Sequence, residues 1–394
     1  MSLLNVIYLA LGVLGLFAFL SVVVLSLIWL ERKVLGRIQL RMGPMRVGPF
    51  GTLQSLADAL KLMTKEDLVP AWADKKVFWL APVAVFLPSF LIWVTVPFAR
   101  NMVLQNLDLG LFYIVAVSVL SVVGLIMAGW GSANKYATLG GLRAAAQLIA
   151  YEIPLVMALL GVGMLVGSLK LTDVVDGNVI NVVKNGQVVA REMSGQHVIP
   201  FAVIQPLGLF LFFIAGLAEI GRTPFDIHHA ESEISGGVMI EYSGMHWAVF
   251  FLAEYINTFA LAALTVLLFF GGWAWPEMPF TVLSVLWFVF KAYLVVLVIF
   301  WLRATYPRLR IDQLMSFGWK LLVPLSFVNI VITGIYLYYN WPAWTLSAMS
   351  FAILIGVFYV IYKRPFSAIE RDTIRVYPVK RSVDVTPAGA KDAS

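Results

Sequence analysis

Residues 3–30, LLNVIYLALGVLGLFAFLSVVVLSLIWL, form an apolar run without a single charged side chain. A helix rises about 1.5 Å per residue, so a helical run of this length can cross the roughly 30 Å hydrocarbon core of a bilayer. The run is too long for the apolar part of a cleavable signal, and it ends in the charged residues 31–33, ERK, rather than at a small-residue cleavage site. It therefore predicts a retained first membrane span.

Similar runs recur along the whole sequence. The 394 residues are 61% hydrophobic and only 13% charged, and the mean hydropathy is +0.88, well beyond what a soluble core requires. The predicted fold class is an all-α polytopic membrane protein. Its single transmembrane domain covers residues 1–362 and a polar tail covers 363–394. About nine spans are predicted, near residues 3–30, 77–98, 111–131, 144–168, 199–219, 247–270, 281–303, 319–340 and 345–362.

Basic residues indicate the orientation of these spans. All but five of the 28 lysines and arginines lie in the predicted loops 31–76, 132–143, 220–246 and 303–320 or in the tail. The exceptions are Arg100, Lys170, Lys184, Arg191 and Lys291. Because basic loops stay on the cytoplasmic side, we expect the N-terminus outside and the C-terminus inside. The same distribution accounts for the basic net charge without nucleic acid as a partner.

The absence of cysteine restricts redox chemistry. No iron–sulfur cluster held by thiolates and no c-type haem can be attached to this chain. The pattern around His228, His229 and Glu231 matches no metal-binding motif, so no metal site is predicted. If the protein takes part in electron transfer, the redox centres belong to partner subunits.

The predicted loop 31–76 contains Gly-Pro twice and then the stretch TLQSLADALKLM. Leu53, Leu56, Ala57, Leu60 and Met63 share one helical face, and Asp58 and Lys61 lie on another, with Thr52 as a possible N-cap. This pattern predicts an amphipathic helix on the inner membrane surface. An ordinary connecting loop is the alternative. On the outer side, the two β-branched runs around Asn185-Gly186 predict a small β-hairpin.

Several ionisable residues fall inside or beside the predicted spans. Glu152, Glu254 and Lys291 lie within spans, and Glu219 lies at a span end. Placing a charged side chain in a membrane costs free energy, so each such residue is expected to have a specific partner or function. The acidic loop that follows contains Arg222, Asp226, Glu231, Glu233 and Glu241. Together they suggest a proton path from the inner surface through Glu219, Glu254 and Glu152 toward Lys291. Alternatively, each acid merely pairs with a basic residue or a partner subunit.

Five segments together carry a resemblance to a known family. They are ERKVLGRIQLRMGPMRVGPFGTLQSLADALKLMTKED, KYATLGGLRAAAQLIAYEIP, AEIGRTPFDIHHAESEISGGVMIEYSGM, FFLAEYINTF and RATYPRLRIDQLMSFGWK. Over roughly residues 1–340, the sequence resembles the subunit 1 family of proton-pumping NADH:quinone oxidoreductase, respiratory complex I. The resemblance implies a membrane subunit that forms part of the quinone tunnel, begins the proton route and anchors the hydrophilic arm.

The resemblance also implies roles for individual residues. Arg32, Phe251 and Arg303 match positions at the quinone entrance, and Asp58 and Lys61 match the charged face beside the tunnel. The matches to the acidic funnel are Glu152, Glu219, Arg222, Asp226, Glu231, Glu233, Glu241 and Glu254. The family usually has a series of glutamates after the position of Asp226, and His229 stands at the first of them in this sequence. The charge at this point of the acidic funnel is therefore changed. The ninth span and the tail exceed the shortest family members.

The family implies quinone as substrate, with flavin and iron–sulfur clusters only in partner subunits. The partners are the hydrophilic quinone-module subunits, small membrane and antiporter-like subunits, and lipid. A bacterial cytoplasmic membrane is favoured over the mitochondrial inner membrane. We hypothesise that quinone reduction shifts the loop 220–246 and thereby the protonation of its carboxylates, and that the change passes through Glu254 and Glu152 to Lys291. Rival classes are a membrane subunit of a ferredoxin-dependent or hydrogenase-type complex, a free-standing transporter and a structural anchor.

Overall fold

The computed structural model describes residues 3–100, 102–176, 179–184, 187–192, 200–227, 231–274 and 280–363. Eight helices in these ranges are long and apolar enough to cross a membrane, and Pro206–Ile220 is a ninth, shorter apolar helix. The predicted all-α polytopic fold is therefore confirmed. The orientation of the two ends and the domain boundary remain predictions. The chain divides into two units, 1–354 and 355–394, and the described part of the second, 355–363, continues the last helix.

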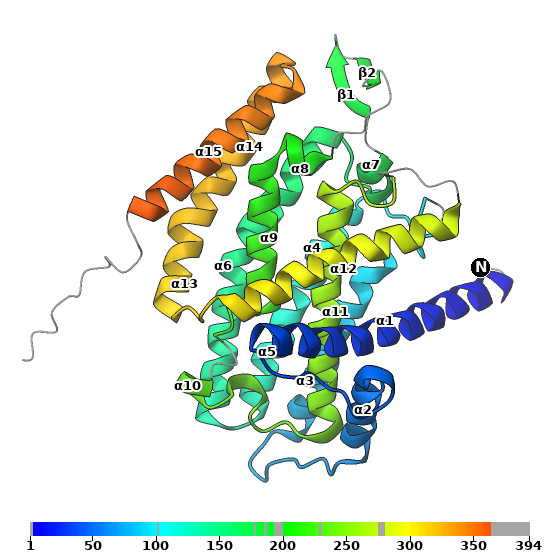
Figure 1. Ribbon diagram of the computed structural model, residues 1–394, viewed down its shortest axis with the longest axis vertical. Coiled ribbons are helices and arrows are strands. Elements are labelled where there is room, and N and C mark those ends of the chain that lie inside the picture. The colour runs from blue at the N-terminus through cyan, green and yellow to red at the C-terminus, as the bar shows by residue number, and fades with distance from the viewer. Residues whose placement is uncertain are drawn as a thin grey trace, which may run out of the picture. The chain divides into compact units, whose positions relative to one another are not determined.

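The helices and strands follow one another in a simple order (Figure 1). The first half contains α1 (Leu3–Ile38), a 3-10 turn (Pro49–Gly51), α2 (Gln54–Thr64), α3 (Lys75–Leu91) with a 3-10 extension (Ile92–Val94), α4 (Gly110–Ser118), α5 (Leu120–Gly131), α6 (Lys135–Val166) and α7 (Leu171–Asp176). Then come β1 (Val179–Lys184), β2 (Gln187–Glu192), α8 (Phe201–Ile204), α9 (Pro206–Ile220), α10 (Glu231–Ile234) and a 3-10 turn (Gly237–Met239). The last part contains α11 (Gly244–Phe269), α12 (Thr281–Thr305), α13 (Ile311–Phe317), a π turn (Gly318–Leu322), α14 (Val323–Tyr339) and α15 (Ala343–Lys363).

Several helices extend beyond the predicted spans. α1 continues to Ile38, so residues 31–33 belong to a helix and not to a loop, and α6 begins at Lys135 rather than near 144. With 32 residues α6 is about 48 Å long, more than a bilayer needs. Hydropathy marks only the part of a helix that lipid or protein covers, whereas backbone hydrogen bonds continue the helix into polar sequence.

The predicted span 199–219 is interrupted. Gln205 separates the single turn α8 from α9, which begins with Pro206. α9 alone has 15 residues and is about 22 Å long, shorter than the hydrocarbon core. Irregular backbone at such depth is tolerated where protein surrounds it, and Gln205 is indeed completely buried.

α11 forms the centre of the helix assembly and is the most completely buried span. It packs against α3, α9, α12 and α1, and α1 and α12 lie side by side across it (Figure 1). Small residues permit close approach between helices, as is common in membranes. A Cβ on Gly216 of α9 would overlap a methyl group of Leu261 on α11, so Leu261 would have to move to admit a larger residue at this crossing.

The predicted amphipathic helix is present as α2, which packs against α1 and α11. Thr52 is not its N-cap, because Leu53 occupies that position and Thr52 closes the preceding 3-10 turn. Leu53, Leu60 and Met63 remain 50–64% exposed. The apolar face is thus left uncovered by the described part of this chain, as a helix on a membrane surface requires.

The predicted hairpin is also confirmed. β1 and β2 pair antiparallel with Lys184 opposite Gln187. The connecting residues 185–186 and the tail from 364 lie outside the described residues. Its position outside the membrane remains a prediction.

Candidate functional site

A cleft of about 790 Å³ opens between α1, α2 and the first three turns of α11. This volume lies in the range of about 300–1,000 Å³ that is usual for small-molecule sites. Apolar side chains form most of its wall, among them Val24, Ile28, Leu62, Trp247 and Phe251. An apolar wall with few polar groups suits a ligand with a hydrophobic body and a polar head.

Charged side chains of α1 and α2 meet in the wall of this cleft. An Arg32 guanidinium nitrogen lies 2.5 Å from one oxygen of Asp58, and the Lys61 ammonium lies 3.9 Å from the other. Burial would raise the pKa of Asp58, but the hydrogen bonds from Arg32 and Gln54 outweigh it and lower the pKa. Asp58 therefore stays ionised. Arg32, Asp58, Lys61 and Phe251 all line the cleft. They are four of the five residues predicted for the quinone site.

An aromatic face of α11 leads away from the cleft. Trp247 and Phe251 stack with ring centroids 4.8 Å apart, and Phe251 meets Tyr255 edge-on at 4.7 Å. The four-residue spacing places these rings one above another on the same side of the helix. Tyr255 in turn lies beneath the Arg222 guanidinium, whose carbon is 4.4 Å from the ring centroid. The face thus joins the cleft to a buried charged cluster.

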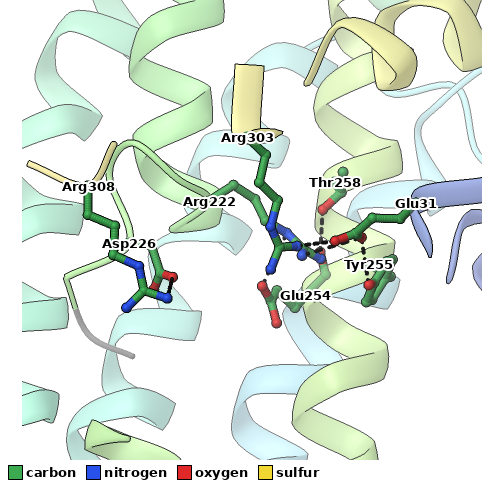
Figure 2. A network of polar contacts seen from close by, with 8 residues as sticks. All are labelled: Glu31, Arg222, Asp226, Glu254, Tyr255, Thr258, Arg303 and Arg308. Atoms are coloured by element: carbon green, nitrogen blue, oxygen red, sulfur yellow. Dashed lines mark hydrogen bonds and ion pairs between the residues drawn. The ribbon is translucent and has the colours of Figure 1, made fainter. Parts of the chain in front are cut away.

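Glu31 is the centre of this cluster (Figure 2). Its carboxylate accepts hydrogen bonds from the guanidinium of Arg303 and, at 2.7 Å, from the hydroxyl of Tyr255. A nitrogen of Arg222 lies 3.6 Å from the same carboxylate, and another lies 3.1 Å from Glu254. The carboxylates of Glu31 and Glu254 thus face the guanidinium groups of Arg222 and Arg303. We call these four residues and Tyr255 the Glu31 cluster.

Burial sets the electrostatics of the Glu31 cluster. The side chain of Arg222 is only 2% exposed. Burial would lower the pKa of Arg222, but the carboxylates of Glu254 and Glu31 outweigh it and raise the pKa. The guanidinium is therefore a fixed positive charge between two carboxylates. Any charge that appears nearby changes their balance in a medium that screens poorly.

Glu31 is a candidate site residue that the sequence pattern does not reveal. Residues 31–33 are predicted to begin a loop, where a glutamate is solvated, whereas the structure buries Glu31 in α1 to 4% exposure. Arg303 was expected at the quinone entrance, and the structure places it in the Glu31 cluster instead of the cleft wall. The sequence feature that could have indicated Glu31 is the charged triplet 31–33 at the end of an apolar run.

Glu219 lies beside two small cavities, of about 60 Å³ and about 50 Å³. The smaller one also reaches Glu254, so it connects the Glu31 cluster to Glu219. Glu152 lies close enough to Glu219 for their carboxylate charges to repel each other. Glu254, Glu219 and Glu152 thus lie in a series, and the proton path through them remains a prediction.

The acidic loop does not form a single cluster in the described residues. Asp226 pairs with Arg308 at 3.2 Å, shown in Figure 2, and Glu233 pairs with Arg143 at 2.5 Å. Glu241 accepts a hydrogen bond of 2.6 Å from Asn134. Each of these three acids thus has a polar partner from a distant part of the sequence, and the role of the acidic loop in a proton path remains a prediction. His229 and the side chain of Glu231 lie outside the described residues.

Lys291 is separated from this series. Its ammonium donates hydrogen bonds to the backbone oxygens of Phe270 (3.0 Å) and Gly272 (2.6 Å), at the end of α11. Phe270 follows Glu254 by sixteen residues, or roughly 24 Å along a helix. A cation at a helix C-terminus stabilises the carbonyls that lack a partner within the helix.

The segment after α2 and the start of α11 meet at the rim of the cleft, and no sequence pattern predicts this contact. The Nδ1 of His246 lies against a carboxylate oxygen of Asp67, and the backbone amide of Leu68 donates to the hydroxyl of Ser243 at 2.9 Å. These contacts fasten the segment after α2 to the start of α11. In the ranges the structure describes, no group of three or more His, Cys, Asp or Glu side chains is arranged to hold a metal ion.

Comparison with known proteins places this arrangement in a family. The family model described as NADH dehydrogenase matches residues 11–334. The H subunit of the NADH-quinone oxidoreductase of Dehalococcoides mccartyi (strain CBDB1) is 49% identical over 319 residues, which cover 81% of this chain and 84% of that protein. The H subunit of the Geobacillus kaustophilus (strain HTA426) enzyme is 47% identical over 326 residues, 82% of this chain and 92% of that protein.

The family match covers most of this chain, including the cleft, the Glu31 cluster and both small cavities, and each of the two relatives aligns with about four fifths of the chain. The match ends before α15, so the last helix lies outside it. The chain belongs to the NADH dehydrogenase family, and the two relatives are H subunits of NADH-quinone oxidoreductases.

Proposed function

We propose that this chain is the membrane subunit of a proton-pumping NADH:quinone oxidoreductase, that its cleft forms part of the quinone tunnel, and that its buried carboxylates begin the proton path. One observation carries the proposal. The aromatic face of α11 lines the cleft with Trp247 and Phe251 and ends at Tyr255 in the Glu31 cluster. A reaction in the cleft would thus occur beside a set of coupled buried charges.

The cleft fits a quinone in its chemistry. Its apolar wall suits an isoprenoid tail, and the aromatic rings of Trp247 and Phe251 suit stacking against a flat head group. Arg32, Asp58 and Lys61 supply hydrogen-bond partners. The exposed Leu53, Leu56 and Leu60 of α2 do not line the cleft, whereas the exposed Met63 does, so a ligand dissolved in lipid could reach the cleft along this helix.

Electron transfer itself belongs to partners, because this sequence contains no cysteine for iron–sulfur ligation. Flavin and clusters are proposed to lie in the hydrophilic subunits that this protein anchors. As a quinone accepts electrons it also takes up protons, and the charge of the cleft changes on the way. We propose that this change alters proton occupancy at Glu254 and then at Glu219 and Glu152. Coupling of this kind requires that the charge in the cleft stabilises one of two states of the protein more than the other.

The setting follows the relatives, which are bacterial. We propose a bacterial cytoplasmic membrane, with lipid around the exposed spans and with other complex I subunits at the inner face and alongside. Small membrane and antiporter-like subunits are the expected lateral partners. Lys291 lies at the far end of α11, where it donates to backbone carbonyls, and its place in the path remains a prediction.

The test is quinone reduction by assembled complexes in membranes that carry Phe251→Ala. Loss of an aromatic wall should raise KM for quinone roughly tenfold or more and weaken a quinone-site inhibitor, because the buried area of one ring is lost. Phe112→Ala is the matched control, since Phe112 is 47% exposed on α4 and does not line the cleft. Unchanged KM and inhibitor sensitivity in Phe251→Ala would refute the assignment of the cleft.

A further inference from the structure

Gln147 on α6 is a buried glutamine whose amide orientation is determined by its neighbours. The side chain is 1% exposed. Its Nε2 donates to the backbone oxygens of Ala218 and Phe225, each at 2.7 Å. Because both partners can only accept, the NH2 end must face them. The carbonyl oxygen Oε1 therefore points away from these two backbone groups.

The Oε1 of Gln147 is an acceptor without a partner among the described residues. Gln147 lines the cavity of about 50 Å³ that also reaches Ser121, Glu219, Glu254 and Asn257. The Oδ1 of Asn257 is likewise buried and, within the described ranges, unpartnered. Ionised carboxylates also only accept hydrogen bonds. In this wall the Oε1 of Gln147 and the Oδ1 of Asn257 are thus acceptors whose donors must come from another molecule, and the carboxylates of Glu219 and Glu254 beside them can accept further hydrogen bonds.

Water meets this requirement. A water molecule supplies O–H donors. Each water needs roughly 10–15 Å³ of cavity volume, so the cavity of about 50 Å³ can hold a few water molecules. The second cavity, of about 60 Å³, shares Ser121, Glu219 and Asn257 with the first. Glu219 and Asn257 therefore stand in the walls of both. Buried polar groups are paired in native proteins, which favours occupancy by water.

We infer that Gln147 builds a water-binding site between Glu254 and Glu219 and links that site to the position of the loop 222–227. The link follows from the bonds of one amide group. Its NH2 end holds the loop at Phe225, and its oxygen orders water in the cavity. The same loop carries Arg222, which pairs with Glu254. A shift of the loop moves both the charge beside Glu254 and the acceptor that orients the water.

Gln147 acts here as a positioning residue. It offers no titratable group, so the proton moves between carboxylates along ordered water, and the amide determines the orientation of that water. This consequence rests on the proposed proton path, whereas the water site itself rests only on the geometry. The two are separable by experiment, because bound water can be seen in a density map regardless of what the complex does.

The test compares Gln147→Met with Gln205→Met in the assembled complex. Methionine keeps the length of the side chain and removes both polar ends. Gln205 is an equally buried glutamine at a helix junction and lines neither cavity, so it controls for the loss of a buried amide. The first readout is a high-resolution cryo-EM map of the unmodified complex and of Gln147→Met. Density for water beside Gln147 Oε1 in the first map and its loss in the second are expected.

The second readout is the rate of quinone reduction coupled to pumping, in H2O and in D2O. Gln147→Met should lower the rate about tenfold, because the water in the cavity loses the hydrogen bond that orients it, and should enlarge the solvent isotope effect. Gln205→Met should leave the isotope effect unchanged. A dry cavity in the unmodified complex would overturn the water site. Water with an unaltered rate and isotope effect in Gln147→Met would overturn the positioning role, and water in a complex that pumps no protons would refute only the proposed function.

Discussion

Glu31 on α1 and Arg303 on the last turn of α12 form an ion pair, although 272 positions separate them in the sequence. The pair fastens the two helices that cross α11, and it does so directly beside Arg222 and Tyr255. A single carboxylate therefore joins α1, α11, α12 and the acidic loop. Four structural elements depend on one buried charge.

Glu31→Gln should destabilise the subunit and slow quinone reduction. The change leaves Arg222 and Arg303 with one carboxylate between them, and breaking a buried ion pair costs about 3–5 kcal/mol. The midpoint of thermal inactivation of the assembled complex is the measurement. The double variant Glu31→Gln with Arg303→Gln should be less harmful than the sum of the single variants, because it removes both members of the pair. Strict additivity of the single effects would contradict this pairing.

The contact between α1 and α2 should depend on pH through Asp58. The folded-state pKa of Asp58 is lowered by Arg32 and Gln54, against the effect of burial. A lowered pKa means that the contact contributes stability above the unfolded pKa and loses it as pH falls through the folded pKa. The pair is partly exposed, so the contribution is about 0.2–1 kcal/mol.

Hydrogen exchange of α2 at several pH values measures this effect. The protection of α2 amides, measured relative to the exchange rate of an unstructured peptide at the same pH, should fall as the pH drops below the ordinary range of an aspartate, near pH 3.9. Asp58→Asn should show low protection at neutral pH and no further loss of protection through that window. If the protection of the unmodified α2 stayed the same across the window, Asp58 would not hold the helix in place.

Ala248→Phe should obstruct the cleft without unfolding the subunit. Ala248 lines the cleft on α11 between Trp247 and Phe251. A phenyl group at this position would occupy space that the proposed quinone needs. We expect KM for quinone to rise several-fold and inhibitor binding to weaken, with assembly retained. Val298→Phe is the control, since Val298 is 43% exposed on α12 and outside the cleft. Equal effects of both variants would argue against a ligand in the cleft.

Gly140→Ala should displace the loop that carries Glu241. A Cβ on Gly140 of α6 would lie 2.8 Å from the backbone nitrogen of Val238 and 2.9 Å from the Cα of Gly237. Backbone atoms cannot rotate aside, so the loop must move, at a cost of about 1–3 kcal/mol. Proteolytic sensitivity of the loop and assembly yield are the measurements. Gly15→Ala, where nothing lies within 4 Å, should behave as wild type.

The membrane architecture follows from sequence because hydropathy is a local property. Each apolar run of sufficient length forms its own hydrogen bonds as a helix in lipid, whatever its neighbours do. For this reason the nine apolar helices of the described ranges and the amphipathic α2 could be predicted, and so could the hairpin around Asn-Gly. The ends of α1 and α6 could not, because helices continue into polar sequence where packing supports them.

The sequence also identified which acids are exceptional. Glu152, Glu219 and Glu254 stand out because a carboxylate is costly in or beside an apolar span, and the structure brings these three together. Gln147 gave no such signal. A glutamine in a span is unremarkable in composition, and only its two carbonyl partners determine the direction of its oxygen.

What the sequence by itself determined is thus the membrane fold, the spans and the residues whose charge needs a reason. What only the tertiary structure decided is which partner each charge has. It placed Arg303 with Glu31, Lys291 at the end of α11, and Asp226 with Arg308. The physical reason is the separation along the sequence over which each interaction acts. Hydropathy and helix formation act between residues close in sequence, whereas a buried charge is stabilised by groups that folding brings within a few ångströms from any distance along the sequence.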